Sequence, residues 1–163
     1  MDEVLEVQRT HIHFTFDGDG HSDGDGHSDG DGDREWPPVA GESLWATELD
    51  GGRYLIDNIP FFVLGIALND VVEAHPRPDG CLRFVRKVSN GGHSTLRVVG
   101  SGQRKDAHVR QLQALGCGIE GSGVGDLFSV DVPPAADLVA VLTLCKQWLA
   151  ADEADYDTGC LQR

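Results

Sequence analysis

The sequence has 163 residues, of which 40% are hydrophobic, and its formal net charge is −14. A chain of this size forms one domain or two small ones around a genuine core. Because 27 acidic residues outweigh 13 Lys and Arg residues, the composition argues against nucleic-acid binding through phosphate contacts. The longest uncharged run, residues 58–69, is too short to cross a membrane, so we expect no membrane association.

The cysteines and the first residues indicate the compartment. The four cysteines, at positions 81, 117, 145 and 160, lack the CxxC spacing of many metal and redox sites. Residues 1–10 lack the basic and then apolar layout of a secretion signal. We therefore predict free thiols and a cytoplasmic protein.

The first predicted element is a strand over residues 11–16, beginning near Val4, in which Ile12, Phe14 and Phe16 alternate with polar side chains. Residues 17–33 then repeat the sequence DGDGHS with no apolar residue and seven aspartates. Glycine loses much backbone entropy on ordering and the like charges repel, so nothing compensates the cost of folding this segment. We predict a disordered insertion within a loop of the domain.

Short strands with tight turns follow the insertion. Residues 43–49 and 53–57 are predicted to form a hairpin around an Asp-Gly-Gly turn, and residues 70–75 pair with residues 81–88. With the first strand, this makes five short strands. They predict a small antiparallel barrel-like N-terminal sheet over residues 1–89.

Residues 90–163 change character, because helical periodicity appears. We predict strands at 95–99, 117–120 and 127–132, a helix over 105–115 capped by Gly116, and a last helix opened by Pro133-Pro134. This β-α-β-β-α order resembles a ferredoxin-like half, with helices on one face of an antiparallel sheet. The predicted fold class is therefore α+β.

Carboxylate and imidazole side chains near the N-terminus suggest metal chemistry. His11 and His13 point to the same face of a strand, as in some zinc sites. In the repeat, Ser28 stands where a calcium loop needs its bidentate glutamate. We interpret the segment as a solvated linker without a dedicated cofactor, in which weak divalent-cation binding is the alternative. The candidate metal ligands are His11, His13, Asp17, Asp19, His21 and Asp23.

Residues 91–97 (GGHSTLR) form the segment with the strongest functional character. His93, Thr95 and Arg97 share one face of the predicted strand, so they could bind an anion, and His93 could act as a general base. The alternative is a turn in which His93 and Ser94 cap the strand while Arg97 neutralises a carboxylate. The aromatic residues beside prolines offer either a peptide-binding surface or a cover for the open end of the barrel; they are Trp36, Trp45, Phe61 and Phe62.

Five spaced segments, WPPVAGESLWA, RYLIDNIPFFVLGIALNDVV, GGHSTLRVV, ALGCGIEGS and SVDVPP, resemble the bacterial family catalogued as domain of unknown function 4265. The resemblance spans residues 34–161. It implies no activity, because the family is functionally uncharacterised. It implies that three segments belong to a shared scaffold or site: Trp36-Pro37, Asn58-Pro60-Phe61 and His93-Ser94-Thr95. The family pattern carries Gly-Asp where this chain has Asn69-Asp70.

Three functions follow from these patterns. The acidic charge and the lack of a nucleophile–base motif favour a non-enzymatic protein-binding module, of the immunity or accessory type, with a basic protein partner. A small enzyme or ligand-binding domain is the second, and a weak cation binder is the third. The candidate ligand or partner residues are Trp36, Asn58, Pro60, Phe61, His93, Ser94 and Arg97.

Overall fold

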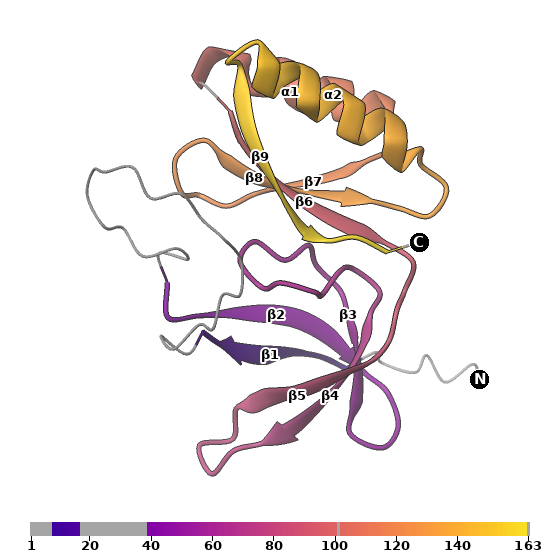
Figure 1. Cartoon of the computed structure of the whole chain (residues 1–163). Coiled ribbons are helices and arrows are strands. Elements are labelled where there is room, and N and C mark those ends of the chain that lie inside the picture. Colours follow the sequence, from indigo (N-terminus) through magenta and orange to yellow (C-terminus); the bar gives the residue numbers. More distant parts are fainter. Residues whose placement is uncertain (1–7, 17–38, 101, 163) are drawn as a thin grey trace, which may run out of the picture.

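The computed structural model of the chain describes residues 8–16, 39–100 and 102–162 (Figure 1). Within these ranges the chain forms two sheets and two α-helices, which confirms the predicted α+β class. The predicted disordered insertion at 17–33 and the predicted start of the first strand near Val4 lie outside the described residues. Of the helices in the described ranges, none combines the length and apolar character needed to span a membrane.

The first sheet is a closed barrel. Its strands are β1 (Arg9–Thr15), β2 (Gly41–Glu48), β3 (Arg53–Ile56), β4 (Val71–Pro76) and β5 (Leu82–Ser89). Consecutive strands pair antiparallel, as predicted, whereas β1 closes the ring on β5 in parallel at Ile12 and Leu82. The strict alternation in β1 buries Ile12 and Phe14 against Leu44, Ile56 and Val72 inside the ring.

The second sheet has the strand order β7-β8-β6-β9, and every neighbouring pair is antiparallel. Its strands are β6 (Ser94–Gly100), β7 (Gly118–Gly121), β8 (Leu127–Val132) and β9 (Ala154–Cys160). The predicted β-α-β-β-α order was incomplete, because β9 adds a strand at one edge. The sequence of β9, ADYDTGC, is rich in aspartate, which is rare in strands, so periodicity gave no signal.

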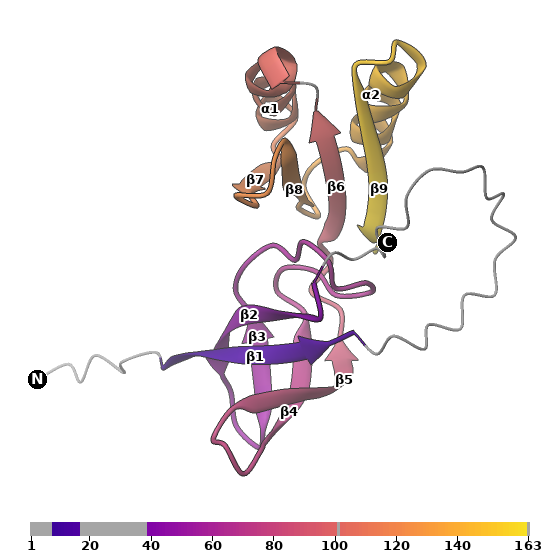
Figure 2. The same ribbon diagram turned by 90° about the vertical axis from the view of Figure 1, so that its left-hand side faces the viewer.

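Two helices cover one face of this sheet (Figures 1 and 2). A 3₁₀ turn at Gly102–Arg104 leads into α1 (Lys105–Ala114), and Gly116 follows it with a φ of 87°, as its predicted capping role requires. Helix α2 (Leu138–Ala150) begins later than predicted. Asp137 is the N-cap, and its carboxylate accepts the Ala140 N–H at 3.1 Å. Pro133 and Pro134 therefore lie before the helix and not in its first turn.

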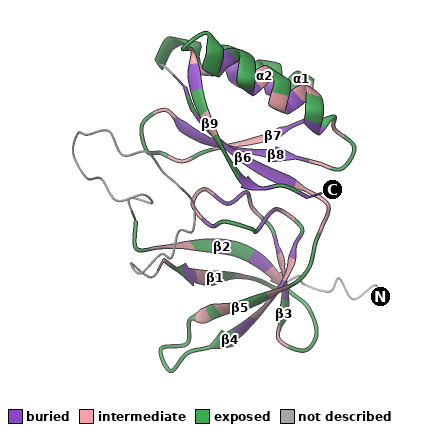
Figure 3. Ribbon diagram, viewed as in Figure 1, coloured by how far each residue is buried: buried purple, intermediate pink, exposed green. Residues whose placement is uncertain are grey.

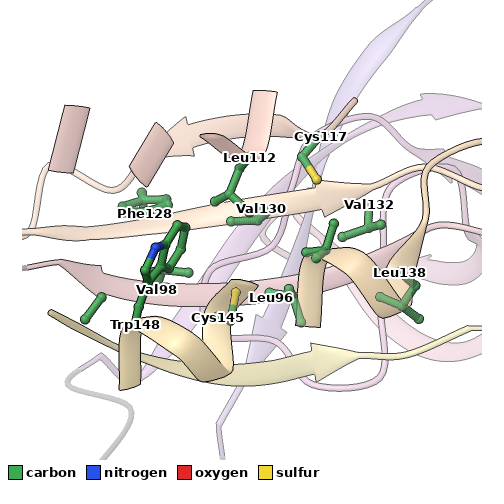
Figure 4. Packing of buried hydrophobic residues seen from close by; sticks show 12 residues of the cluster. Leu96, Val98, Leu112, Cys117, Phe128, Val130, Val132, Leu138, Cys145 and Trp148 are labelled. Carbon is green, nitrogen blue, oxygen red and sulfur yellow. The ribbon is translucent and has the colours of Figure 1, made fainter. Parts of the chain in front are cut away.

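The core between the sheet and the helices is apolar. Leu96 and Val98 of β6, with Phe128 and Val130 of β8, pack against helix residues such as Trp148 (Figure 4). Cys117 and Cys145 lie in this core as free thiols, and burial raises the pKa of each to about 11. Both therefore act as small apolar side chains at neutral pH.

The opposite face of the second sheet is covered as well. It faces the barrel (Figures 1 and 2), and every residue of β8 is buried, as is every residue of β6 except Val99 (Figure 3). The segment between β3 and β4, residues 57–70, forms much of this contact: for example, the Gly65 N–H donates to the Gly159 carbonyl at 2.9 Å. The two sheets therefore meet at a buried junction that includes β6.

Candidate functional site

A polar layer lies on the face of the second sheet that is turned away from the helices. Thr95 and Arg97 of β6 and Ser129 and Asp131 of β8 alternate with the core residues, and all four are buried. Their register pairs Thr95 with Asp131 and Arg97 with Ser129. We call these four residues the polar layer.

His93 lies at the edge of the polar layer. Its Nδ1 is 2.8 Å from Asp131 Oδ1, and its Nε2 is 3.1 Å from Asn69 Nδ2. Because the Asn69 amide nitrogen can only donate, Nε2 accepts this bond and Nδ1 carries the proton that is donated to Asp131. The pair of contacts therefore fixes both the tautomer and the orientation of the imidazole ring.

Asn69 reaches His93 from a backbone conformation that few residues tolerate. Its φ is 65°, and asparagine is one of the few side chains that adopt this left-handed region readily. The Asn69 backbone also passes so close to Gly91 that a Cβ at residue 91 would lie 2.3 Å from the Asn69 carbonyl oxygen. Asn69 thus makes the turn that this positive φ requires and adds a side-chain donor to His93.

Two carboxyl groups at the junction have perturbed acidity. Burial raises the pKa of Asp131, although the hydrogen bond and charge of His93 oppose this effect. Burial also raises the pKa of Glu120, against hydrogen bonds from the Ile59 N–H and the Asn58 side chain; Glu42 and Asp131 add to the increase. Both groups therefore hold a proton to higher pH than exposed carboxyls do.

Arg97 and Phe61 tie the 57–70 segment to the sheet. The Arg97 guanidinium forms an ion pair with Asp157 and donates to the Phe61 carbonyl at 3.4 Å. On the other side, the Glu42 carboxylate of β2 accepts three successive backbone N–H groups, from Phe61 at 2.7 Å and from residues 62 and 63 at 2.9 Å. The segment is thus held to both sheets through Phe61.

Asp70 is the most heavily bonded side chain of the junction. It is fully buried and accepts hydrogen bonds from the Ala67 N–H, the Gly91 N–H, the Gln162 amide and Lys87 Nζ. Gln162 also joins Ser94, whose Oγ accepts the Gln162 N–H at 3.0 Å. Ser94 lines a pocket of about 340 Å³, together with Asn90, Gly92, Val132, Pro133, Pro134 and Gln162. Most of these bonds connect the barrel, the crossing at residues 90–92 and the end of β9.

The predicted partner or ligand residues fall into three groups. Phe61, His93 and Arg97 lie at the junction. The side chains of Asn58 and Ser94 bond to backbone groups: Asn58 Oδ1 accepts the Trp45 N–H at 2.8 Å, and Ser94 Oγ accepts the Gln162 N–H. Pro60 is buried beside them. Trp36 lies outside the described residues. The sequence interpretation gave no role to Glu42, Asp70, Glu120, Asp131 or Gln162, although the alternation of apolar and polar residues in LFSVDV points to the polar face that holds Asp131.

The candidate metal ligands of the barrel have other contacts. The His11 ring lies with its centroid 3.5 Å from that of Trp45, and His13 Nδ1 is 3.0 Å from Ser43 Oγ. Among the residues that the structure describes, no three His, Cys, Asp or Glu side chains are grouped to hold a metal ion. The other candidates, Asp17, Asp19, His21 and Asp23, lie outside those residues.

An acidic groove runs beside β9. It consists of two adjoining hollows of about 310 Å³ and 240 Å³ that share Val99 and Asp155. Four carboxylates line it; Asp157 is paired with Arg97 and Glu153 with Arg104, so Asp152 and Asp155 supply its net negative charge. Val99 and Leu149 add half-exposed apolar surface. The lining residues are Arg97, Val99, Gly100, Leu127, Leu149, Asp152, Glu153, Ala154, Asp155, Tyr156 and Asp157.

A barrel joined to an antiparallel sheet with two helices defines an α+β protein whose polar groups gather at the junction and beside β9. The chain belongs to the family DUF4265, a domain of unknown function, which matches residues 42–156. No curated protein matches the sequence. The fold is similar to that in a "Novel crystal structure of a hypothetical protein from Neisseria gonorrhoeae", with a TM-score of 0.72 and 20% identity over 96% of each chain.

Proposed function

We propose that the protein is a non-enzymatic protein-binding module, of the immunity or accessory type, whose acidic groove binds a basic partner. The groove is the observation that carries this proposal. It combines the carboxylates of Asp152 and Asp155, beside the ion-paired Glu153 and Asp157, with exposed apolar side chains. Such a surface favours Lys and Arg side chains, whose long stems also cover apolar surface. The net charge of −14 adds long-range attraction to a basic protein.

The junction supports binding over catalysis. Both ring nitrogens of His93 have hydrogen-bond partners, and the Ser94 hydroxyl is bonded to the Gln162 backbone. Asp70 is saturated by donors from four residues. Groups engaged in this way hold the two sheets together, whereas the groove is open to a partner.

The test is affinity capture with a charge-reversed groove. Full-length protein, the Asp155→Lys variant and the control Asp50→Lys would be used as baits at low and moderate salt. Captured proteins would be identified, purified and titrated by calorimetry. Asp50 is exposed in the turn between β2 and β3, so the control makes the same change in charge on the other sheet.

We expect a basic protein that binds the wild type and the Asp50→Lys control with similar affinity and binds Asp155→Lys at least about tenfold more weakly. Its affinity falls with added salt, because exposed charges are screened. Equal binding by all three baits would contradict the groove as the binding surface. No basic partner at either salt concentration would contradict the function.

A second candidate function is ligand binding or acid–base chemistry at His93. The 2.8 Å contact with Asp131 favours it, since an oriented imidazole with a protonated Nδ1 is the arrangement of a general base. Titration with small carboxylates and phosphate, followed by NMR of the histidine rings, tests it. We expect the His93 ring signals to move while those of exposed His75, the control, do not; no change at His93 would contradict it.

The remaining sequence predictions stay proposals. The strand order β7-β8-β6-β9, with both helices on one face, supports a ferredoxin-like arrangement of residues 90–163. The change of sheet between Ser89 and Ser94 supports a division into domains 1–89 and 90–163.

A cytoplasmic location rests on the sequence, as does weak divalent-cation binding by the repeat. Calorimetric titration with calcium, zinc and nickel tests the latter, and affinities weaker than about millimolar would contradict it.

A further inference from the structure

We infer that the basic partner binds as an extended segment that adds a strand to the free edge of β9. This inference rests on the proposed function and specifies how the partner is recognised. In this mode, backbone hydrogen bonds supply affinity, and alternate side chains supply specificity.

The topology provides the edge. In the order β7-β8-β6-β9, strand β9 is outermost and is paired through Thr95–Gly100 of β6 on one side. Among the residues that the structure describes, no strand pairs with its other side (Figure 2). Gly159 and Cys160 are buried, and the Gly159 carbonyl accepts the Gly65 N–H, so the backbone groups that a second strand can use are those of residues 155–158.

The side chains of β9 define what that second strand must carry. Asp155 and Asp157 lie two residues apart and therefore on the same face, with their register partners Val99 and Arg97. Residues directly opposite each other on neighbouring antiparallel strands also share a face. Asp157 is already ion-paired with Arg97, so a segment with Lys or Arg at alternate positions gains its new ion pair opposite Asp155.

The acidic groove extends this match beyond the strand. Its two hollows meet at Asp155, so a basic side chain opposite Asp155 can reach either one. Val99, which is 47% exposed, lies between them and offers apolar contact to the stem of that side chain. Asp152 adds negative charge at the start of β9, where Glu153 is paired with Arg104.

The same carboxylates determine what is rejected. A second copy of this chain would bring its own Asp155 and Asp157 beside these two, and like charges on neighbouring strands are destabilising. Acidic and self-complementary partners are therefore disfavoured, which gives the edge specificity for basic strands.

Three fluorescent peptides and the full-length protein test this inference by anisotropy. The first alternates Lys with Val, the second has the same sequence with N-methylated backbone amides at alternate residues, and the third replaces Lys by Glu. We expect the first to bind, the N-methylated peptide to bind at least about tenfold more weakly because it cannot donate to an edge, and the Glu peptide not to bind. Amide NMR shifts should locate the first peptide on residues 154–160.

Protein variants complete the design. Asp155→Asn should weaken binding of the Lys–Val peptide by about fivefold or more, whereas the control Asp50→Asn should not change it. Equal affinity for the N-methylated peptide, with the Asp155→Asn loss retained, would overturn strand addition but leave the acidic groove as the binding surface. NMR shifts confined to other elements would overturn strand addition too. Failure of every basic peptide and of the capture experiment would overturn the proposed function as well.

Discussion

Strands β6 and β8 of the second sheet are buried on both faces, except at Val99, but the two faces are built from opposite chemistry. The face under the helices carries Leu96, Val98, Phe128 and Val130, whereas the face toward the barrel carries the polar layer. Adjacent residues of the same two strands thus serve different purposes. Burial alone does not distinguish a stabilising core from a junction between two sheets. The two are distinguished by whether the buried atoms are apolar or polar.

The difference concerns what each face requires of its partner. Apolar side chains need only close packing, and their burial stabilises the fold in proportion to the area removed from water. Buried polar atoms need hydrogen-bond partners in defined directions, and any atom without one costs free energy. The apolar face therefore supplies stability, and the polar face specifies how the two sheets are placed.

The largest expected effect comes from breaking the apolar face. Phe128→Ala removes a fully buried ring and leaves a cavity, so we expect the free energy of unfolding to fall by about 3–5 kcal/mol. Urea denaturation measures it. Val99→Ala, on an exposed side chain of the neighbouring strand, is the control and should change stability by less than about 1 kcal/mol. Equal losses for both would contradict the assignment of the core.

A somewhat smaller loss is expected at the junction. Asp70→Ala removes the acceptor of donors from four residues and leaves several of them buried without a partner, which we expect to cost about 3 kcal/mol. Asp50→Ala is the exposed control. Urea denaturation with hydrogen exchange should place the lost protection at the backbone amides of residues 67 and 91. A loss confined to the barrel interior would contradict the linking role of Asp70.

Two serines on neighbouring strands differ in whether the hydroxyl group has a hydrogen-bond partner. The Ser94 hydroxyl bonds to Gln162, so we expect Ser94→Ala to cost about 1 kcal/mol. The Ser129 hydroxyl is buried and has no hydrogen-bond partner among the described residues, so Ser129→Ala should be neutral or stabilising by up to about 1 kcal/mol. Chemical denaturation of both variants measures the difference. A larger loss for Ser129→Ala would indicate that its hydroxyl has a partner.

The smallest effect concerns pH. Because the pKa of Glu120 is raised in the folded state, the folded chain binds more protons than the unfolded chain between the ordinary and the raised value. Its contribution to stability is therefore lost as pH rises through that interval. Glu120→Gln removes this dependence while keeping an acceptor for the Ile59 N–H. We expect the variant to gain stability relative to the wild type as pH rises above the ordinary glutamate pKa of about 4, until Glu120 is fully ionised. A constant difference in unfolding free energy across these pH values would contradict the raised pKa.

Much of the fold was accessible from the sequence because local patterns specify it. The alternation of Ile12 and Phe14 predicts β1, and the Asp-Gly-Gly turn predicts the β2–β3 hairpin. Strand β9 was missed because its aspartates carry no strand signal, and it is held by pairing with β6. The start of α2 was placed too early, because the proline rule outweighed the N-cap Asp137.

The candidate site was predicted only in part, for a related reason. His93, Thr95 and Arg97 are spaced two residues apart, and this spacing correctly predicts that they lie on one side of the strand. That side meets the barrel. The partners of these side chains come from distant positions, such as Asp131 for His93 and Asp157 for Arg97. Residue spacing along one strand says nothing about which other strand lies beside it.

The sequence by itself determined the acidic charge, the α+β class, the family and most strands and helices, because each depends on composition or on short periodic patterns. Only the tertiary structure decided that β9 is an edge strand, that His93 is oriented by Asn69 and Asp131, and that Asp70 joins the two sheets. The physical reason is that these features depend on hydrogen bonds between residues far apart in the chain. Their directions exist only after the barrel and the second sheet have packed together.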